Sequence, residues 1–103
     1  MSGPLLDIQW DDAKARANAA KHGVTFARAA TVMLDPLALT VFDSAHSDTE
    51  ERWFTLGQAS DGQLLAVSHT HQVLDGNRTC IRLISAREAT RREREHYENE
   101  QTR

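Results

Sequence analysis

Near the N-terminus, hydrophobic residues recur at the spacing of helices. Alanines are dense between residues 12 and 21, and Asp11 or Asp12 is a good N-cap for a first helix, which Gly23 would end in a left-handed conformation. A second helix is predicted to begin at the Thr25 cap. Its apolar face is made by Phe26, Ala29, Ala30 and Met33. Because only Gly23-Val24 separates the two helices, they should pack as an antiparallel hairpin.

Elsewhere the hydrophobic residues alternate with polar ones, which is typical of strands. A first strand is predicted over residues 5–10, before the helices. After Asp35-Pro36, which ends the second helix, alternation predicts strands over residues 37–42, 53–56, 64–70 and 78–84. Short polar turns, two of them with Asp-Gly, join these four strands, so they should form an antiparallel meander. The predicted fold class is α+β, with two N-terminal helices on a mainly antiparallel sheet and a C-terminal helix.

The last strand is predicted to pass directly into the last helix at Ser85. Ser85 and Glu88 have the S-x-x-E spacing of a capping box, in which each side chain accepts a hydrogen bond from the other residue's backbone N–H. The helix that follows is strongly charged, and its small apolar face fades before Tyr97. Two interpretations remain: either this helix docks by its first turn and is otherwise solvated, or its mixed charges contact a partner protein.

Length and composition narrow the possible classes of protein. With 103 residues the chain should form one domain over residues 5–103, after a disordered segment at residues 1–4. A net charge of −3 does not indicate nucleic-acid binding, so that function would need a local cluster of cations. The single cysteine, Cys80, fits a reducing compartment and is expected to be a small buried residue. No segment has the length of a membrane span or the pattern of a secretory signal, so a cytoplasmic protein is expected.

Three arginines are candidates for binding phosphate, because a guanidinium group pairs well with its oxygens. Arg82 lies near the end of a strand among apolar neighbours, where a long cation needs a partner. An ion pair with Glu51 or Glu88 is the structural alternative. Arg87 is expected in a first helical turn, where the helix dipole disfavours a cation. Arg52 precedes Trp53, and together they can hold a phosphate and stack its base, unless Trp53 is a core or interface residue.

Candidates for proton transfer are His69, Glu51 and His22. A histidine can accept or donate a proton near neutral pH, whereas Glu51 is either a general base or part of a solvated acidic face. His69 and His71 also have spacing that suits zinc, but no third ligand is evident, so no metal site is predicted. Lys21 and His22 are candidates for contacting RNA, although cations also suit the last turn of a helix.

The order and spacing of several short motifs resemble the BrnT family of type II toxin–antitoxin systems. The similarity extends from about Ile8 to Tyr97. Its motifs are Trp10-Asp11, Lys21-His22-Gly23-Val24, Asp35-Pro36, Glu51-Arg52-Trp53, Leu56-Gly57, Arg82-Leu83-Ile84-Ser85-Ala86-Arg87, Arg92-Glu93-Arg94 and Tyr97.

The resemblance implies a RelE-like fold and a toxin that arrests growth by cutting RNA. It also implies neutralisation by a BrnA-like antitoxin that carries a ribbon-helix-helix DNA-binding part, and repression of the operon by the complex, so that operator DNA is met only through the antitoxin. The expected enzyme is an endoribonuclease that needs no metal or other cofactor. Its catalytic residues would be Glu51, Arg52, His69, Arg82 and Arg87, and its further RNA-binding residues Trp53, Lys21 and His22. The alternative, motivated by the net negative charge, is a non-catalytic module of the same fold that only binds a partner.

Overall fold

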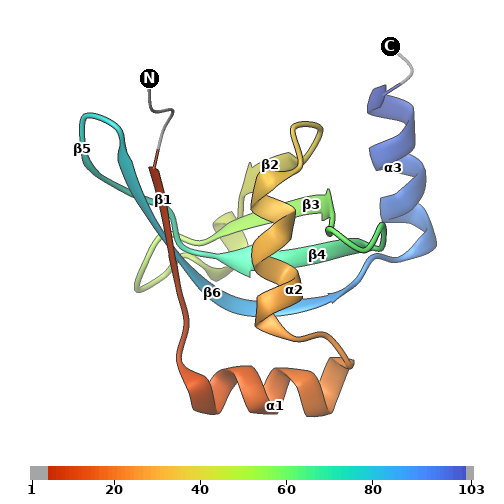
Figure 1. The fold of residues 1–103 in the computed structure, drawn as a ribbon. Coiled ribbons are helices and arrows are strands. Elements are labelled where there is room, and N and C mark those ends of the chain that lie inside the picture. The colour runs from red at the N-terminus through yellow and green to blue at the C-terminus, as the bar shows by residue number, and fades with distance from the viewer. Residues whose placement is uncertain (1–4, 102–103) are drawn as a thin grey trace.

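A twisted sheet lies at the centre of the fold, with α1 and α2 on one side and α3 at one end (Figure 1). The computed structural model describes residues 5–101, so the disorder expected at residues 1–4 lies outside the described part. None of the helices in this part is long and apolar enough to cross a membrane. The strands are β1 Leu5–Gln9, β2 Leu39–Phe42, β3 Trp53–Gln58, β4 Leu64–His69, β5 Gln72–Asp75 and β6 Arg78–Glu88; the α-helices are α1 Asp12–His22, α2 Phe26–Thr31 and α3 Arg91–Gln101; and the 3-10 turns are η1 Val32–Leu34 and η2 Ser44–His46.

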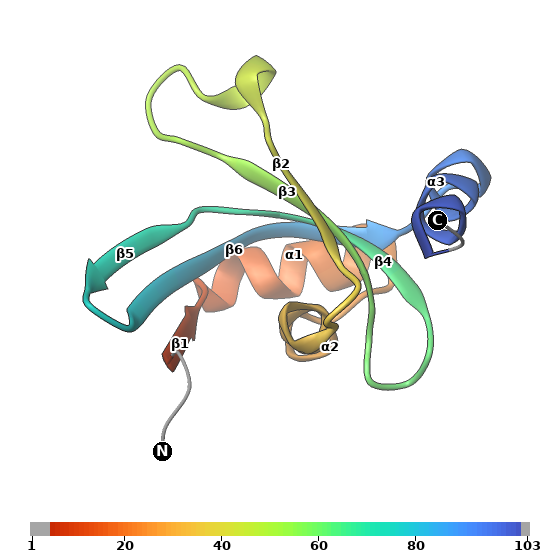
Figure 2. The same cartoon turned by 90° about the horizontal axis from the view of Figure 1, so that it is seen from above.

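The sheet confirms the predicted α+β class and adds one strand. Its order is β1-β6-β4-β3-β2, and β5 pairs with the first part of β6. All pairings are antiparallel except β1 with β6, which run parallel, so the sheet is mixed. The added strand is β5, whose exposed residues gave too weak an alternation to predict it. Figure 2 shows β5 and α3 at opposite ends of the sheet.

The two N-terminal helices form as predicted, but not as an antiparallel hairpin. Asp11 caps α1 by accepting from the Lys14 N–H, Thr25 caps α2 by accepting from the Arg28 N–H, and Gly23 ends α1 with φ 70°. Figures 1 and 2 show α2 crossing α1 instead of running back along it. The reason is that both helices pack mainly on the sheet, so the sheet and not their short link sets their directions.

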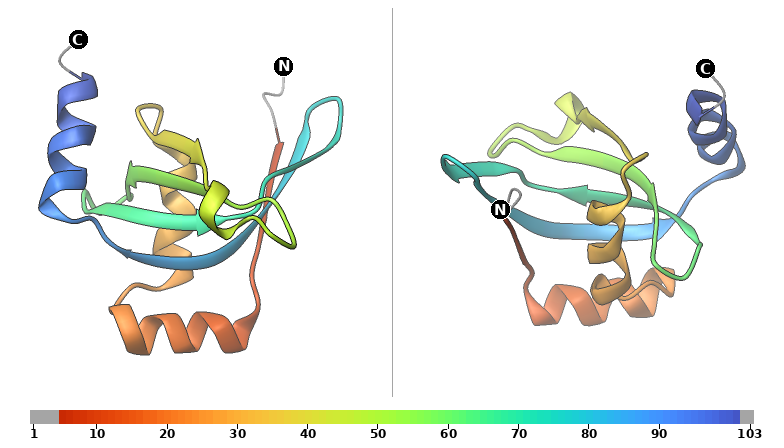
Figure 3. Two further views of the ribbon diagram at one scale, coloured as in Figure 1. Left: turned by 180° about the vertical axis from the view of Figure 1, so that it is seen from behind. Right: turned by 45° about the horizontal axis from the view of Figure 1, so that its top comes forward.

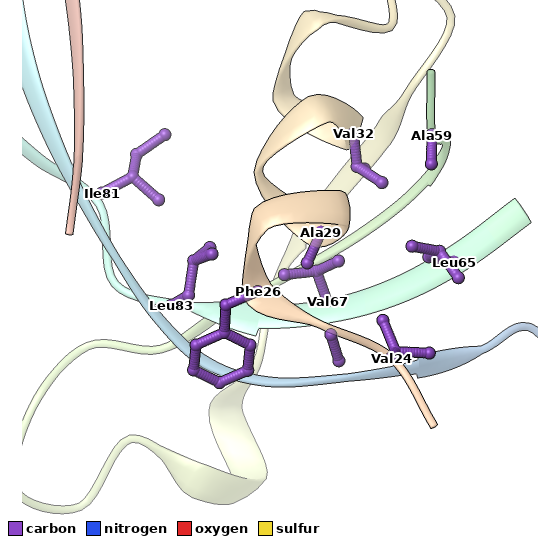
Figure 4. Close-up of a cluster of buried hydrophobic side chains, with 10 residues drawn as sticks. Val24, Phe26, Ala29, Val32, Ala59, Leu65, Val67, Ile81 and Leu83 are labelled. Atoms are coloured by element: carbon purple, nitrogen blue, oxygen red, sulfur yellow. The ribbon is translucent and has the colours of Figure 1, made fainter. Parts of the chain in front are cut away.

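The main core lies between α2 and the concave part of the sheet (Figure 4). Phe26 is only 2% exposed, and burying a side chain of this size stabilises the fold by about 2–3 kcal/mol. Cys80, expected to be buried, is only partly so. The core residues come from α2 and the turns on either side of it, from β4 and β6, and from the turn after β3: Val24, Phe26, Ala29, Val32, Ala59, Leu65, Val67, Ile81, Leu83 and Ala86.

A bulge in β6 changes which way its residues face. His69 of β4 lies opposite Leu83, whereas the preceding Ser68 lies opposite Ser85, so Ile84 is an extra residue. Leu83 and Ala86 are both in the core although regular alternation would put them on opposite faces. As a result, Arg82 before the bulge and Arg87 after it both point to the face that α1 and α2 leave uncovered.

Asn18 of α1 holds β6 just after this bulge. Its amide accepts from the Ala86 N–H (3.0 Å) and donates to the Ala86 carbonyl (2.9 Å) and to the Val24 carbonyl (2.9 Å). These Ala86 groups point away from β4, along the edge of β6 that β1 no longer covers, because β1 pairs only as far as Arg82. The side chain is 7% exposed, and it supplies the hydrogen bonds that a longer β1 would otherwise make.

The predicted capping box at Ser85 and Glu88 is wrong. These residues belong to β6, where they pair with Ser68 and Leu65 of β4. The box that starts the helix lies further on, where the Thr90 hydroxyl accepts from the Glu93 N–H (3.1 Å) and Glu93 accepts from the Thr90 N–H (2.8 Å). The burial of Ala86 and the ladder to β4 stabilise the strand beyond Ser85, so a second S/T-x-x-E pattern begins the helix.

Tyr97 anchors α3 far beyond its first turn, which corrects the expectation that only this turn docks. Figure 3 shows α3 standing at the end of the sheet. Tyr97 is 8% exposed, packs with Leu56, Leu64 and Ala66, and donates to the Asp35 carboxylate at 2.6 Å. Burial first, and then this hydrogen bond, raises the pKa of Tyr97 to about 12. Burial by itself raises the pKa of Asp35. Hydrogen bonds from the Gln58 N–H, the Tyr97 hydroxyl and the Leu37 N–H together outweigh burial, so the pKa of Asp35 lies below its ordinary value.

Replacing Asn18→Ala should lower the free energy of unfolding by about 3 kcal/mol, because it leaves a buried backbone N–H and two carbonyls without partners. Urea denaturation followed by circular dichroism measures this. Asn77→Ala is the matched control, since Asn77 is exposed in the turn before β6 and should change stability by less than about 0.5 kcal/mol. Equal effects of the two substitutions would contradict the role given to Asn18.

Tyr97 is the only tyrosine of the chain, so its titration can be followed by phenolate absorbance. The native protein should titrate with a midpoint near pH 12, against about 10 in denaturant, and Asp35→Asn should move the native midpoint toward about 10. Because folding raises the pKa of Tyr97, its hydrogen bond to Asp35 stabilises the fold fully at pH values below the pKa of Tyr97 in the unfolded chain. This stabilisation is lost as the pH rises through the pKa of Tyr97 in the folded protein. A native midpoint already near 10 would show that α3 is not anchored in this way.

Candidate functional site

A groove of about 340 Å³ lies on the face of the sheet that α1 and α2 do not cover. Its walls come from β3, β4, β6 and from the β2–β3 connection, which extends on the side away from α2 (Figure 2). The lining includes two of the predicted arginines, Arg52 and Arg87, together with an Asp–His pair that the sequence analysis did not single out. The full lining is Asp43, His46, Arg52, Phe54, Ser68, Ile84, Ser85 and Arg87.

Arg52 enters the groove with hydrogen-bonding capacity to spare. Its Nε is buried and has no hydrogen-bond partner among residues 5–101. The Glu50 carboxylate lies 3.8 Å from this nitrogen, which is beyond hydrogen-bond distance. A buried guanidinium N–H without an acceptor is costly, and it leaves the Arg52 side chain, which lines the groove, without a hydrogen bond at this nitrogen.

Arg87 is held rigidly at the other side of the groove. Its guanidinium donates to both oxygens of Glu93, at 2.8 and 3.0 Å, and these hydrogen bonds raise the pKa of Arg87 above its ordinary value. The guanidinium carbon lies 6.0 Å from the centre of the Phe54 ring. Because Glu93 also caps α3, the start of that helix fixes the position of Arg87.

Arg82 does not converge with Arg87, although both lie on the same face. It donates to both oxygens of Glu50, each at 2.7 Å, and these hydrogen bonds hold the pKa of the Glu50 carboxyl below its usual range. The expected ion-pair alternative is therefore present, but with Glu50 in place of Glu51 or Glu88. Arg82 is outside the groove and connects to it through Glu50 and Arg52. Glu51 is exposed and does not line the groove.

His69 is a buried structural residue, which does not fit the expected role in proton transfer. It is 1% exposed, its Nδ1 donates to the Thr70 carbonyl (2.9 Å), and its Nε2 accepts from the Thr55 hydroxyl (2.7 Å). Burial lowers the pKa of His69, which favours the neutral ring. Since both nitrogens are occupied, this ring has no free nitrogen for an RNA hydroxyl or for the zinc site considered with His71.

Trp53 lies on the opposite face of the sheet from Arg52, so the two cannot hold one nucleotide together. Consecutive strand residues point to opposite faces, and Trp53 is in register with Phe42 on one side and His69 on the other. Its ring meets Phe42 edge to face at a centroid distance of 5.2 Å, and His71 at 6.0 Å. Its Nε1 is buried and has no partner within the described part of the chain.

Lys21 and His22 lie beside the groove, not in it. They line a second, shallower hollow of about 230 Å³ at the end of α1. Ile84 and Ser85 line both hollows, so the bulge of β6 separates them. The basic residues at the C-terminal end of α1 therefore lie next to the groove, across the bulge of β6.

The Asp–His pair of the groove comes from the polar connection before β3. His46 Nδ1 lies 2.9 Å from the Asp43 carboxylate, and both side chains line the groove with Arg52. The sequence feature that could have revealed this pair is the Asp-x-x-His spacing, because a single helical turn such as η2 brings side chains three residues apart together. Only the fold reveals that this turn faces Arg87. In residues 5–101 there is no group of three or more His, Cys, Asp or Glu side chains arranged to hold a metal.

Comparisons with known proteins agree with this architecture. The family model described as "Ribonuclease toxin, BrnT, of type II toxin-antitoxin system" matches residues 10–93. The crystal structure of the Brucella abortus ribonuclease toxin BrnT is similar, with a TM-score of 0.59 and 25% sequence identity, covering 84% of this chain and 99% of that one. No curated protein sequence matches the chain. The match over residues 10–93 covers most of the chain, which therefore belongs to the BrnT family of ribonuclease toxins of type II toxin–antitoxin systems.

Proposed function

We propose that this toxin is an endoribonuclease that cuts RNA in the groove between Arg52 and Arg87, without a metal ion, and thereby arrests growth in the cytoplasm. The observation that carries the proposal is the groove itself, whose lining brings together Arg87 and Arg52, an arginine whose buried Nε lacks an acceptor. Preorganised cations of this kind stabilise the charge that develops on phosphoryl oxygens during cleavage.

The predicted residues take unequal parts in this proposal. Arg52 would bind the scissile phosphate directly, and Arg87 would contact it from the opposite wall. Arg82 would act through Glu50, by holding that carboxylate away from the Arg52 Nε. Lys21 and His22 would bind a flanking phosphate, since their hollow adjoins the groove. His69 and Trp53 are left out because they do not reach it.

Type II toxins are paired with antitoxin proteins, and the family match implies such a partner for this chain. We further propose that the antitoxin carries a ribbon-helix-helix DNA-binding part and that the complex represses its own promoter. The chain's net charge of −3 supports the proposal that the antitoxin, and not the toxin, binds the operator DNA. Direct binding of DNA by the toxin would be electrostatically unfavourable outside the groove.

The decisive test is RNA cleavage by the purified chain in the presence of EDTA. Arg52→Ala should slow cleavage by about 100-fold or more, because removing one donor from a phosphoryl or oxyanion site typically costs this much. Arg91→Ala is the matched control: its side chain is 93% exposed on α3, outside the groove, and its loss should leave the rate unchanged.

Two results would contradict parts of the proposal. If the chain leaves RNA intact both with EDTA and with added Mg²⁺, the binding-module alternative is favoured. If cleavage occurs only with added metal, the metal-independent mechanism is wrong although the ribonuclease function stands.

A further inference from the structure

Cleavage of RNA at this groove requires a group that takes the proton of the 2′-hydroxyl. We propose that His46 is this general base and that Asp43 is its positioning residue. The inference rests on the proposed ribonuclease function and adds to it a catalytic residue that neither the sequence motifs nor the family match assigns.

The polar connection before β3 is tied firmly to the backbone of Arg52. The Asp43 N–H donates to the Arg52 carbonyl (2.8 Å), and the Arg52 N–H donates to the Ser47 hydroxyl (3.0 Å). The same hydroxyl donates to the Asp43 carbonyl at 2.6 Å. These bonds fix the Asp–His pair relative to the phosphate-binding arginine, which is what a proton-transfer group needs.

The geometry of the pair also selects the tautomer of His46. The Asp43 carboxylate, 2.9 Å from Nδ1, can only accept, so in the neutral ring the proton is on Nδ1 and the lone pair is on Nε2. The His46 side chain is 68% exposed and the Asp43 side chain 22%. A ring that lines the groove and is oriented by a partly buried carboxylate, with an unprotonated second nitrogen, is arranged as a general base.

The other carboxylates near the groove, which could also act as bases, already accept hydrogen bonds from arginines. Glu50 is bound through both oxygens by Arg82, and Glu93 through both oxygens by Arg87. The charged groups that line the groove with His46 are Asp43, Arg52 and Arg87. Neither arginine can accept a proton, and the Asp43 carboxylate is engaged with the ring. Within the described residues, His46 is thus the titratable side chain of the groove with a free acceptor.

The step balances without a metal or an oxidant. The 2′-hydroxyl proton passes to His46 Nε2 as the 2′-oxygen forms a bond to phosphorus. The bond from phosphorus to the 5′-oxygen breaks, and its electron pair leaves with that oxygen, which takes a proton from water. The products are a 2′,3′-cyclic phosphate and a free 5′-hydroxyl. The hydroxide left by that water takes the proton from His46, which regenerates the neutral ring.

Rescue by imidazole tests His46 directly. His46→Ala should slow RNA cleavage by about 100-fold or more, as expected for loss of a general base, and added imidazole should restore part of the rate because the site is open. His96→Ala is the control, since His96 is an exposed histidine on α3 outside the groove and its loss should have no effect. Circular dichroism of each variant establishes that it is folded.

Asp43→Asn tests the positioning role through the split between kcat and KM. The carboxylate fixes the tautomer and orientation of the His46 ring, so its loss should lower kcat by about 10-fold or more and leave KM nearly unchanged, and Asp43→Glu should restore part of the rate. An unchanged kcat in Asp43→Asn would overturn the role of Asp43.

The possible failures are distinct. If the unmodified chain does not cut RNA, both the proposed function and this inference are wrong. If it cuts RNA and His46→Ala cuts equally well, only the inference is wrong. A loss in His46→Ala that imidazole does not repair also overturns it, since His46 would then serve binding or folding.

Discussion

The extra residue in β6 is the constraint on which the site depends. Leu83 and Ala86 both enter the core only because Ile84 is inserted between the paired positions, and the same shift puts Arg87 on the open face. Asn18 makes this arrangement stable, because its amide satisfies Ala86 at the point where β1 has ended. One helix side chain thus holds the bulge, and the bulge directs Arg87 into the groove.

The electrostatics of the groove depend more on ion pairs between arginines and carboxylates than on the net charge of the chain. The chain is acidic overall, yet two arginines face each other across a small hollow. Arg82 and Arg87 each carry a carboxylate partner, so both are held in place before any ligand binds. Of these three arginines, Arg52 is the one with a buried N–H that lacks an acceptor, and it lines the groove with the Asp–His pair. An anion would therefore be drawn to the point where proton transfer is available.

Short sequence patterns predict the structure correctly where the contacts that decide it lie within one helical turn. The caps at Asp11 and Thr25 and the left-handed Gly23 depend on neighbours within one helical turn, and each was predictable from the residues themselves. The Ser85 box was equally good as a local pattern and still wrong, because pairing with β4 and burial of Ala86 outweigh a cap that contributes about 1 kcal/mol. His69 was a reasonable proton carrier by type, but its burial removes it from the solvent.

The amino-acid sequence by itself determined the α+β class, the family, and two of the groove's arginines, Arg52 and Arg87. These depend on residue types and on short-range order. Only the tertiary structure decided which candidates share a surface: it separated Arg52 from Trp53 and brought His46 within reach of Arg52. The reason is that the face of a strand residue depends on alternation and bulges, and the position of a loop depends on distant backbone partners. Neither can be read from spacing along the chain.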